Sequence, residues 1–265
     1  MSERASEPSN PSDLLLPSFR LDGRVALLTG ASSGLGARFA RILHASGAEV
    51  VLAARRLDRL EKLAAELDGS HAIACDVADP DSVRHLVETT LTETGRIDVL
   101  VNNAGLANPM PAEDEPLEVF REVLDVNLVG LFHLSQLAGK AMLAAGQGVI
   151  VNVASILGLV ASGQLPQTGY VASKGAVVNL TRELGVQWAR RGVRVNAIAP
   201  GWFPSEMTEE MFSQESGQRW IHRNTPMGRG GEANELDGAL LYLASDASTY
   251  VTGQTIAVDG GWTAR

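Results

Sequence analysis

Residues Val25 to Thr29 (VALLT) run directly into Gly30 to Gly36 (GASSGLG), and helical periodicity begins at Leu35. The apolar run predicts a buried strand, and a glycine-rich turn between a strand and a helix is typical of phosphate-binding sites. Glycine allows a pyrophosphate to approach the backbone, and the free N–H groups at the helix start attract its charge. The spacing GxxxGxG differs from the common fingerprint GxGxxG. The interpretation therefore depends on the position of the glycines between a strand and a helix.

The rest of the chain alternates short apolar runs with longer segments of helical period, which predicts an α/β fold. We expect one doubly wound, Rossmann-type domain with a seven-stranded parallel sheet flanked by helices. The predicted strands are Val25 to Thr29, Glu49 to Ala53, Ala72 to Cys75, Val99 to Asn102, Val149 to Val153, Val193 to Ile198 and Thr255 to Val258. The predicted helices are Leu35 to Ser46, Leu57 to Leu67, Pro80 to Thr94, Leu117 to Ala145, Gly169 to Arg191 and Ala233 to Ser245.

Two segments differ from this pattern. Residues 1–19 are rich in Ser, Pro and Glu, which predicts a disordered leader before a domain spanning residues 20–265. Residues 205–229 carry scattered apolar side chains between polar ones and are expected to form a short helical lid. The lid either covers a partly apolar substrate or simply packs on the domain body.

Composition excludes several classes of partner. A net charge of -9 and a pI of about 5.1 do not favour nucleic acid or an anionic membrane surface. Cys75 is the only cysteine and no Cys/His cluster has metal-ligand spacing, so we expect neither a disulfide nor a metal. With no predicted signal peptide or membrane span, the sequence predicts a cytoplasmic protein.

Further motifs follow later strands in order. With Thr29, the glycine turn reads TGxxxGxG; Asp76-Val77 follows the third strand and Asn102-Asn103-Ala104-Gly105 the fourth. From about residue 21 onward the chain resembles the short-chain dehydrogenase/reductase family, including its 3-oxoacyl-acyl-carrier-protein reductases and gluconate 5-dehydrogenases. The resemblance implies a nicotinamide dinucleotide cofactor bound by Gly30, Ser32, Ser33, Gly34, Leu35 and Gly36. It also implies adenine contacts at Asp76 and Val77, and a central sheet steadied beside the cofactor by Asn103, Ala104 and Gly105.

The end of the second strand bears on cofactor choice. An acidic residue there would bind both ribose hydroxyls of NAD, but Ala54 stands at that place, followed by Arg55 and Arg56. A guanidinium pairs with a 2'-phosphate, so Arg55, with Ser32 and Arg56 as candidate helpers, is predicted to select NADP(H), with NAD(H) as the weaker cofactor. Both arginines could instead be solvated surface residues.

Tyr170 and Lys174 are four residues apart at the start of a helix, so both project from one face. A phenol has a pKa near 10, and a nearby ammonium together with an oxidised nicotinamide would favour the phenolate. The resemblance implies that Tyr170 transfers a proton, Lys174 holds the nicotinamide ribose, Ser155 polarises the substrate oxygen and Asn127 supports a water relay. The implied reaction is hydride transfer between the nicotinamide and a carbonyl or carbinol carbon.

At the carboxyl edge of the sixth strand, Pro200 and Gly201 are expected beside the nicotinamide. The resemblance implies a carboxamide contact at Ser205, where the family often has Thr. One departure concerns Ser155 and Tyr170, which are separated by a loop two residues longer than is common in the family. We expect this loop, Ile156 to Gly169, to alter the pocket wall without abolishing catalysis.

The substrate stays open among a 3-oxoacyl thioester, ranked slightly ahead, a sugar or polyol, and a steroid-like ketone. A non-catalytic NADP(H)-sensing regulator and a scaffold are the alternatives from other classes. Ser155, Tyr170 and Lys174 argue against the sensor, which has no need of them, and the full cofactor signature argues against the scaffold. The long apolar helices and the C-terminal Gly260-Gly261-Trp262 suggest a homotetramer, or a homodimer.

Overall fold

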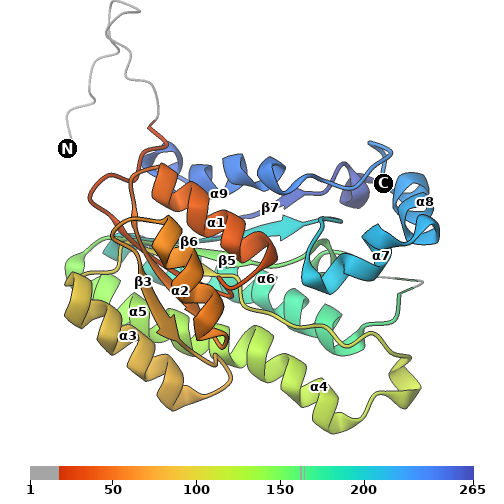
Figure 1. Cartoon of the computed structure of the whole chain (residues 1–265), viewed down its shortest axis with the longest axis horizontal. Helices are drawn as coiled ribbons and strands as arrows, with labels where there is room; N and C mark the ends of the chain where they lie inside the picture. Colours follow the sequence, from red (N-terminus) through yellow and green to blue (C-terminus); the bar gives the residue numbers. More distant parts are fainter. Residues whose placement is uncertain (1–17, 162, 164) are drawn as a thin grey trace, which may run out of the picture.

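A computed structural model of the chain describes residues 18–161, 163 and 165–265 (Figure 1). The predicted leader therefore lies outside the described residues, except for Ser18 and Phe19. Two positions of the loop between Ser155 and Tyr170 are also outside them.

The predicted parallel sheet is confirmed, with seven strands in the order β3-β2-β1-β4-β5-β6-β7. The strands are β1 Val25–Thr29, β2 Glu49–Ala54, β3 His71–Ala74, β4 Val99–Asn102, β5 Gly148–Val153, β6 Val193–Pro200 and β7 Thr255–Val258. The largest difference from the predicted bounds is in β6, which continues to Pro200 because Ala199 and Pro200 pair with β7.

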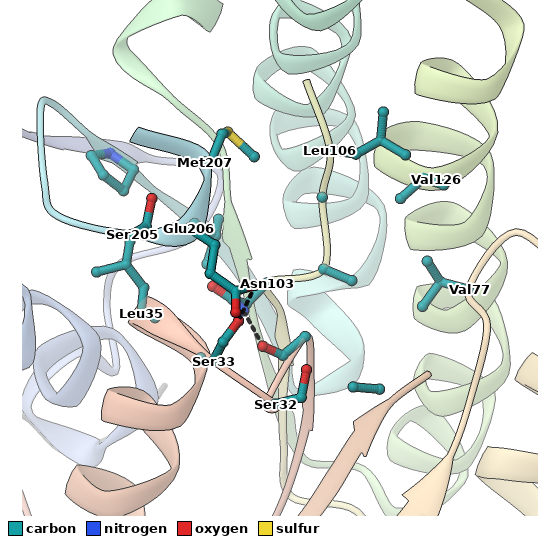
Figure 2. A pocket seen from close by; sticks show the side chains of 18 of the residues that line it. Ser32, Ser33, Leu35, Val77, Asn103, Leu106, Val126, Ser205, Glu206 and Met207 are labelled. Carbon is teal, nitrogen blue, oxygen red and sulfur yellow. Dashed lines mark hydrogen bonds between the residues drawn. The ribbon is translucent and has the colours of Figure 1, made fainter. Parts of the chain in front are cut away.

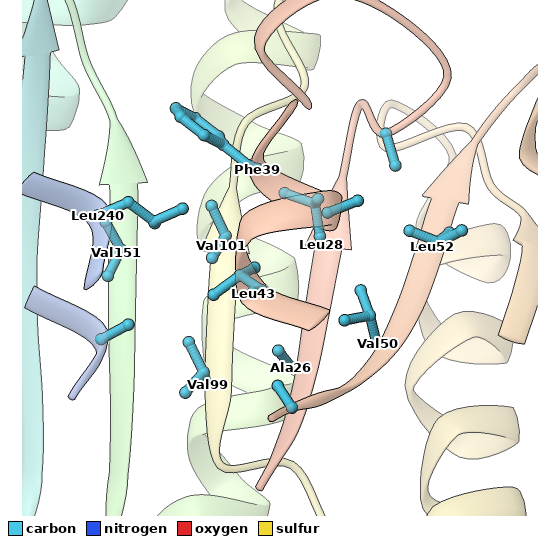
Figure 3. Packing of buried hydrophobic residues seen from close by; sticks show 14 of the residues in the cluster. Ala26, Leu28, Phe39, Leu43, Val50, Leu52, Val99, Val101, Val151 and Leu240 are labelled. Carbon is cyan, nitrogen blue, oxygen red and sulfur yellow. The ribbon is translucent and has the colours of Figure 1, made fainter. Parts of the chain in front are cut away.

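Helices cover both faces of the sheet (Figure 1). One layer contains α1 Gly34–Ala45, α2 Leu57–Glu66 and α9 Asp237–Ala244; the other contains α3 Pro80–Thr94, α4 Leu117–Leu124, α5 Leu131–Ala145 and α6 Thr168–Trp188. Successive strand residues face opposite layers, so Leu28 packs with Phe39 and Leu43 of α1 (Figure 3). Leu27 packs on the other side with Leu134 of α5. The short elements are η2 Ala112–Asp114, η4 Ile156–Gly158, η5 Ala189–Arg191, η6 Glu206–Thr208, α7 Glu209–Ser213, α8 Glu215–Asn224, η7 Ala233–Leu236, η8 Asp246–Ser248 and η9 Trp262–Ala264.

The predicted helix Leu117 to Ala145 is interrupted at its centre. Residues Asp125–Gly130 (η3) form a π-helix between α4 and α5. Gly130 lies against the backbone of Val77, where an added Cβ would stand 2.1 Å from the Val77 carbonyl oxygen. Single π turns inside α-helices are frequent at functional sites, and this one contains Asn127.

Leu117–Ala145 also has the length and apolar composition of a membrane span, with a mean hydropathy of 1.3 over its most apolar window. Core helices of proteins without any membrane contact meet the same criteria, and α5 packs against α3 and the sheet. The length and composition of this helix are therefore weak evidence for a membrane span.

The strand order places the ligand-binding edge. The chain moves outward from β1 to β2 and β3, then returns to β4 beside β1 and moves in the opposite direction. Open α/β sheets bind ligands at the carboxyl ends of the strands beside such a reversal. The glycine turn after β1 and the segment Asn103 to Gly105 after β4 meet at this point.

Candidate active site

A cleft of about 390 Å³ opens at this edge of the sheet. Every predicted site residue lines it except Asn127: Gly30, Ser32, Ser33, Gly34, Leu35, Gly36, Arg55, Asp76, Val77, Asn103, Ala104, Gly105, Ser155, Tyr170, Lys174, Pro200, Gly201 and Ser205. The parallel strands thus bring residues from seven segments of the chain to one cavity, which contains both the glycine turn and the predicted catalytic group.

The glycine turn is held tightly against the start of α1. Gly30 has φ +67°, and an added Cβ at Gly36 would stand 2.0 Å from the Gly30 carbonyl oxygen, so neither position accepts a side chain without movement. The Asn103 side-chain amide donates to the carbonyl oxygens of Thr29 and Gly30 at 3.0 and 3.2 Å. The Thr29 hydroxyl accepts from the backbone N–H groups of Asn103 and Ala104 at 3.1 and 3.2 Å. These bonds fix the shape of the phosphate-binding turn.

The predicted adenine contacts lie on one wall of the cleft. Figure 2 shows Val77 and Val126 on the side opposite Ser205 and Glu206. The Asp76 carboxylate accepts a hydrogen bond from the backbone of Ala78 at 3.0 Å, which holds the turn after β3 in place. The wall formed by the valines is apolar and suits one face of a purine ring.

At the end of β2, the two arginines have different environments. Arg56 donates to the hydroxyl of Ser32 at 3.0 Å and to that of Ser33 at 2.9 Å. Arg55 lines the same cleft but is exposed, and within the described part of the chain its side chain has no hydrogen bond or ion pair. The geometry therefore moves the emphasis from Arg55, which the sequence favoured, to Arg56 as the guanidinium placed beside the glycine turn.

Ser155, Tyr170 and Lys174 meet at the other end of the cleft. The Ser155 hydroxyl hydrogen-bonds with Tyr170 and also accepts from the backbone of Leu157 at 3.1 Å. The Lys174 ammonium lies 5.7 Å from the centre of the Tyr170 ring and donates to the Val153 carbonyl oxygen at 2.7 Å. The three side chains predicted to act together are thus in mutual contact range.

The longer loop before Tyr170 does not separate this group. Its first part forms η4 behind Ser155, and near its end Gln167 forms an isolated bridge with Met110. The Met110 N–H donates to the Pro166 carbonyl oxygen at 3.0 Å, which ties the loop to the segment after β4. The additional residues are therefore accommodated in the loop while Ser155 still reaches Tyr170.

Asn127 is fully buried in the π-helix. Its Oδ1 accepts from the Leu106 N–H and its Nδ2 donates to the Leu106 carbonyl oxygen, both at 2.9 Å. A Cβ added at Gly105 would stand 3.3 Å from Asn127 Oδ1 and 3.5 Å from Lys174 Nζ. Asn127 therefore adjoins Lys174 across Gly105 without itself lining the cleft.

Burial controls the protonation of the two titratable groups. It raises the pKa of Tyr170, and the hydrogen bond from Ser155 opposes this shift. It lowers the pKa of Lys174 from 10.5 to about 8. The phenol pKa is therefore raised, and not lowered as expected from the neighbouring ammonium, because desolvation disfavours the phenolate. Tyr170 therefore keeps its phenolic proton at neutral pH in this environment.

The chain after β6 closes the cleft. The Gly201 N–H donates to the Val258 carbonyl oxygen at 2.9 Å, which keeps Pro200 and Gly201 at the strand edge. The hydroxyls of Ser205 and Thr208 are 3.0 Å apart, and Ser205 begins η6. The Ser205 hydroxyl thus lies at the cleft with Thr208 as its partner, and its contact with a carboxamide stays a prediction.

Comparison with known proteins gives the family. The model of the family described as Enoyl-(Acyl carrier protein) reductase matches residues 30–263. Galactitol 2-dehydrogenase (L-tagatose-forming) of Cereibacter sphaeroides is 43% identical, over 92% of this chain and 97% of that protein. The chain belongs to the short-chain dehydrogenase/reductase family. D-threitol dehydrogenase of Mycolicibacterium smegmatis is 40% identical to this short-chain dehydrogenase/reductase, over 93% of the chain and 95% of its relative.

Solved structures of the short-chain dehydrogenase/reductase family share the whole fold. A gluconate 5-dehydrogenase from Burkholderia cenocepacia J2315, crystallised in complex with NADP and tartrate, is 36% identical with a TM-score of 0.89. The comparison covers 94% of this chain and 98% of that one. The resemblance expected from the motifs is confirmed at the level of family and fold.

One contact at the cleft of this short-chain dehydrogenase/reductase, that of Glu206 with two arginines, was not predicted. Glu206 follows Ser205 and reaches across to Arg56 and to Arg59 of α2, with N–O distances of 2.9 and 2.6 Å. A carboxylate next to Ser205 and two arginines after β2 were visible in the sequence. Their contact was not, because about 150 residues separate Glu206 from the arginines and no local pattern relates segments so far apart.

Three tryptophans form a cluster beside Tyr170. The ring centres of Trp202 and Trp220 are 5.3 Å apart, those of Trp202 and Trp262 5.7 Å, and those of Trp220 and Trp262 5.3 Å. Tyr170 packs on the same cluster. Because Trp220 belongs to α8, these contacts fasten the 205–229 segment to the domain body, which favours the packing alternative for its apolar side chains.

Proposed function

We propose that this protein is an NADP(H)-dependent oxidoreductase that interconverts a ketone and a secondary alcohol. The observation that carries the proposal is the meeting of Ser155, Tyr170 and Lys174 at one end of a cleft whose other end is the glycine turn. A nicotinamide dinucleotide is long enough to connect a phosphate-binding turn with a proton donor at the opposite end of such a cleft.

The residues at the turn fit a 2'-phosphorylated cofactor. Ser33 and Arg56 already hold a carboxylate there, with distances of 2.9 Å from each to Glu206. An anion therefore has donors of the right kind at the end of β2, where a 2'-phosphate is expected. When bound, the nicotinamide supplies or accepts a hydride. The NADP complex of the Burkholderia cenocepacia protein supports the same cofactor for this chain.

The side chains of the chain account for the proton and for the substrate oxygen. In the reductive direction, Tyr170 donates its phenolic proton to the carbonyl oxygen, because burial keeps that proton in place at neutral pH. The Ser155 hydroxyl donates a hydrogen bond to the same oxygen and stabilises the charge that develops on it. The Lys174 ammonium, fixed on the Val153 carbonyl, holds the ribose and supports proton return to Tyr170. Asn127, adjoining Lys174, is assigned the support of a water relay.

A polyol, a sugar or a sugar acid is the favoured substrate class among those left open by the sequence. Galactitol, threitol and gluconate occur in the names of the relatives described above. A 3-oxoacyl thioester is the second candidate, since the matching family description refers to an acyl carrier protein. The non-catalytic sensor is disfavoured because Ser155, Tyr170 and Lys174 are brought together.

The test is NADPH oxidation and NADP⁺ reduction over a panel of polyols, sugar acids, ketoses, 3-oxoacyl thioesters and cyclic ketones, with NADH and NAD⁺ in parallel. We expect turnover with at least one polyhydroxylated substrate and a preference for the phosphorylated cofactor. Turnover with the thioesters alone would make a 3-oxoacyl thioester the favoured substrate in place of a polyhydroxylated one. NADPH binding without turnover on the whole panel would support the sensor instead.

The pKa of Lys174 predicts a pH limit for the reduction. A group with a pKa of about 8 carries its charge below that pH and loses it above. We therefore expect kcat/KM for carbonyl reduction to be constant below about pH 7 and to fall as the pH rises through about 8. The raised pKa of Tyr170 cannot produce a limb in this range. A kcat/KM profile that stays level to pH 9.5 would contradict the role assigned to the Lys174 ammonium.

We propose a homotetramer, or a homodimer, assembled through the long helices. Val129 of the π-helix and Phe132 of α5 are 53% and 41% exposed, and Val186 of α6 is 75% exposed. Apolar side chains gathered on helices that face solvent are typical of subunit contacts. Light scattering should give four or two times the chain mass of 28.1 kDa, and Val186→Glu should reduce it. A monomer at micromolar concentration would contradict the proposal.

We place the protein in the cytoplasm. Its single cysteine, Cys75, is buried, and burial raises the pKa of its thiol, so it is poorly suited to disulfide chemistry. Cell fractionation should recover the chain without detergent, and recovery only from the membrane fraction would restore the membrane interpretation of Leu117–Ala145.

A further inference from the structure

The carboxylate of Glu206 lies within a cluster of cationic and hydroxyl donors at the glycine turn. It accepts from the Ser33 hydroxyl at 2.9 Å, from Arg56 at 2.9 and 3.2 Å, and from Arg59 at 2.6 Å. Figure 2 shows Glu206 descending from the side of Ser205 and Met207 toward Ser33 and Ser32. A side chain of the 205–229 segment therefore spans the cleft.

These donors are the groups that an external phosphate would need. Ser32 and Arg56 hydrogen-bond each other at 3.0 and 3.2 Å, so the pair is already aligned at the end of β2. Both Glu206 oxygens are used, since one contacts Ser33 and Arg56 while the other contacts Arg56 and Arg59. A phosphate cannot have the full set of these contacts while the carboxylate keeps them.

The neighbouring backbone strengthens this closure. A Cβ added at Gly34 would stand 3.4 Å from the Ser205 side chain, so the start of η6 lies directly on the glycine turn. The hydrogen bonds from Arg56, and then from Arg59 and Ser33, lower the pKa of Glu206 to about 2. Glu206 is consequently ionised at every pH at which the protein would work, and its contacts respond to a competing anion rather than to pH.

We propose that Glu206 acts as an internal anion that fills the 2'-phosphate site and is displaced when a 2'-phosphorylated nucleotide binds. The proposal rests on the function proposed above and adds a residue that sets cofactor affinity. Displacement breaks the only charged tether between η6 and the start of α2 within the described residues, so cofactor binding and release of η6 are coupled, while the tryptophan cluster keeps α8 on the domain body. Only NADP(H) loses binding affinity through this displacement, because a nucleotide without the 2'-phosphate leaves the Glu206 contacts in place.

The first test compares dissociation constants by calorimetry for the wild type, Glu206→Gln and Glu209→Gln. Glu209 is an exposed carboxylate in α7, so its replacement removes the same charge from the same segment. The Glu206 contacts are about half exposed, and their competition is expected to weaken NADPH binding by about tenfold. Glu206→Gln should therefore bind NADPH about tenfold more tightly, with NADH changed less than about twofold, and Glu209→Gln should match the wild type.

The second test follows the segment itself without a complete cofactor. Hydrogen exchange of residues 206–213 is measured in the free chain, with adenosine 2',5'-bisphosphate, and with adenosine 5'-phosphate. The bisphosphate should speed exchange in the wild type to the level of free Glu206→Gln, and should leave that variant unchanged. Adenosine 5'-phosphate, which lacks the competing group, should not alter exchange in either protein.

Exchange that is unchanged or slower with the bisphosphate in the wild type would overturn the proposal, since the carboxylate would then be a bystander. Equal gains in NADPH affinity for both glutamine variants would overturn it as well, because the effect would be one of general charge. These outcomes differ from failure of the proposed function, in which the wild type would bind neither NADPH nor NADH.

Discussion

Replacing Tyr170 with Phe is expected to lower kcat for carbonyl reduction by about 10³-fold, within the range that general acid catalysis contributes. The substitution removes one hydroxyl, which is both the proposed proton donor and the hydrogen-bond partner of Ser155. The ring keeps its place beside the tryptophan cluster, so the fold and the glycine turn are left intact. NADPH affinity should change less than about twofold, because the loss is confined to the reacting step.

Tyr250→Phe is the matched control, since Tyr250 is fully exposed and far in sequence from the cleft residues. It should keep the wild-type rate. A Tyr170→Phe protein with more than a tenth of the wild-type kcat would remove Tyr170 from its role as proton donor. Loss of NADPH binding in the same variant would point to a structural role in place of a chemical one.

Replacing Arg56 with Ala should raise the dissociation constant for NADPH by about 30-fold, while NADH changes less than about threefold. The guanidinium is bonded to Ser32 and Ser33, so its removal takes away the charge and also frees the serines that it aligns. We reduce the expected effect below that of a buried ion pair because the Arg56 side chain is 40% exposed.

Arg55→Ala serves as the comparison because Arg55 is adjacent, carries the same charge and lines the same cleft. If Arg55→Ala weakens NADPH binding as much as Arg56→Ala does, the cofactor is selected by the combined positive charge of both arginines. If only Arg55→Ala weakens NADPH binding, the sequence-based preference for Arg55 was correct and the contacts of Arg56 serve the turn alone.

Most of the fold follows from local patterns. The strand Val25–Thr29, the glycines after it and the helix after them are contiguous, so the sequence contains the whole phosphate-binding turn. The motifs after β3, β4, β5 and β6 could then be placed together because parallel strands all end at one edge of the sheet. Tyr170 and Lys174 were predictable as a pair from their helical spacing.

Other features depend on contacts between distant segments. Arg55 and Arg56 are equivalent in sequence, and only the direction of each side chain at the start of α2 distinguishes them. Glu206 meets Arg56 and Arg59 through the return of the chain after β6, which no local pattern encodes. The shift in the Tyr170 pKa was expected downward from a neighbouring charge, whereas the burial that opposes it exists only in the folded chain.

The π-helix at Asp125–Gly130 makes chain length itself a determinant of the site. Each residue of an α-helix advances the direction of the side chains by about 100°, so one residue fewer in this stretch would rotate α4 against α5 by roughly that angle. Asn127 would turn away from Leu106, and Gly130 would lose its fit against Val77. The loop before Tyr170 accommodates extra residues, whereas the helix around Asn127 does not tolerate a change in length. Insertions and deletions are therefore tolerated in the loop at the rim of the pocket, but not in the helix that lies beneath it.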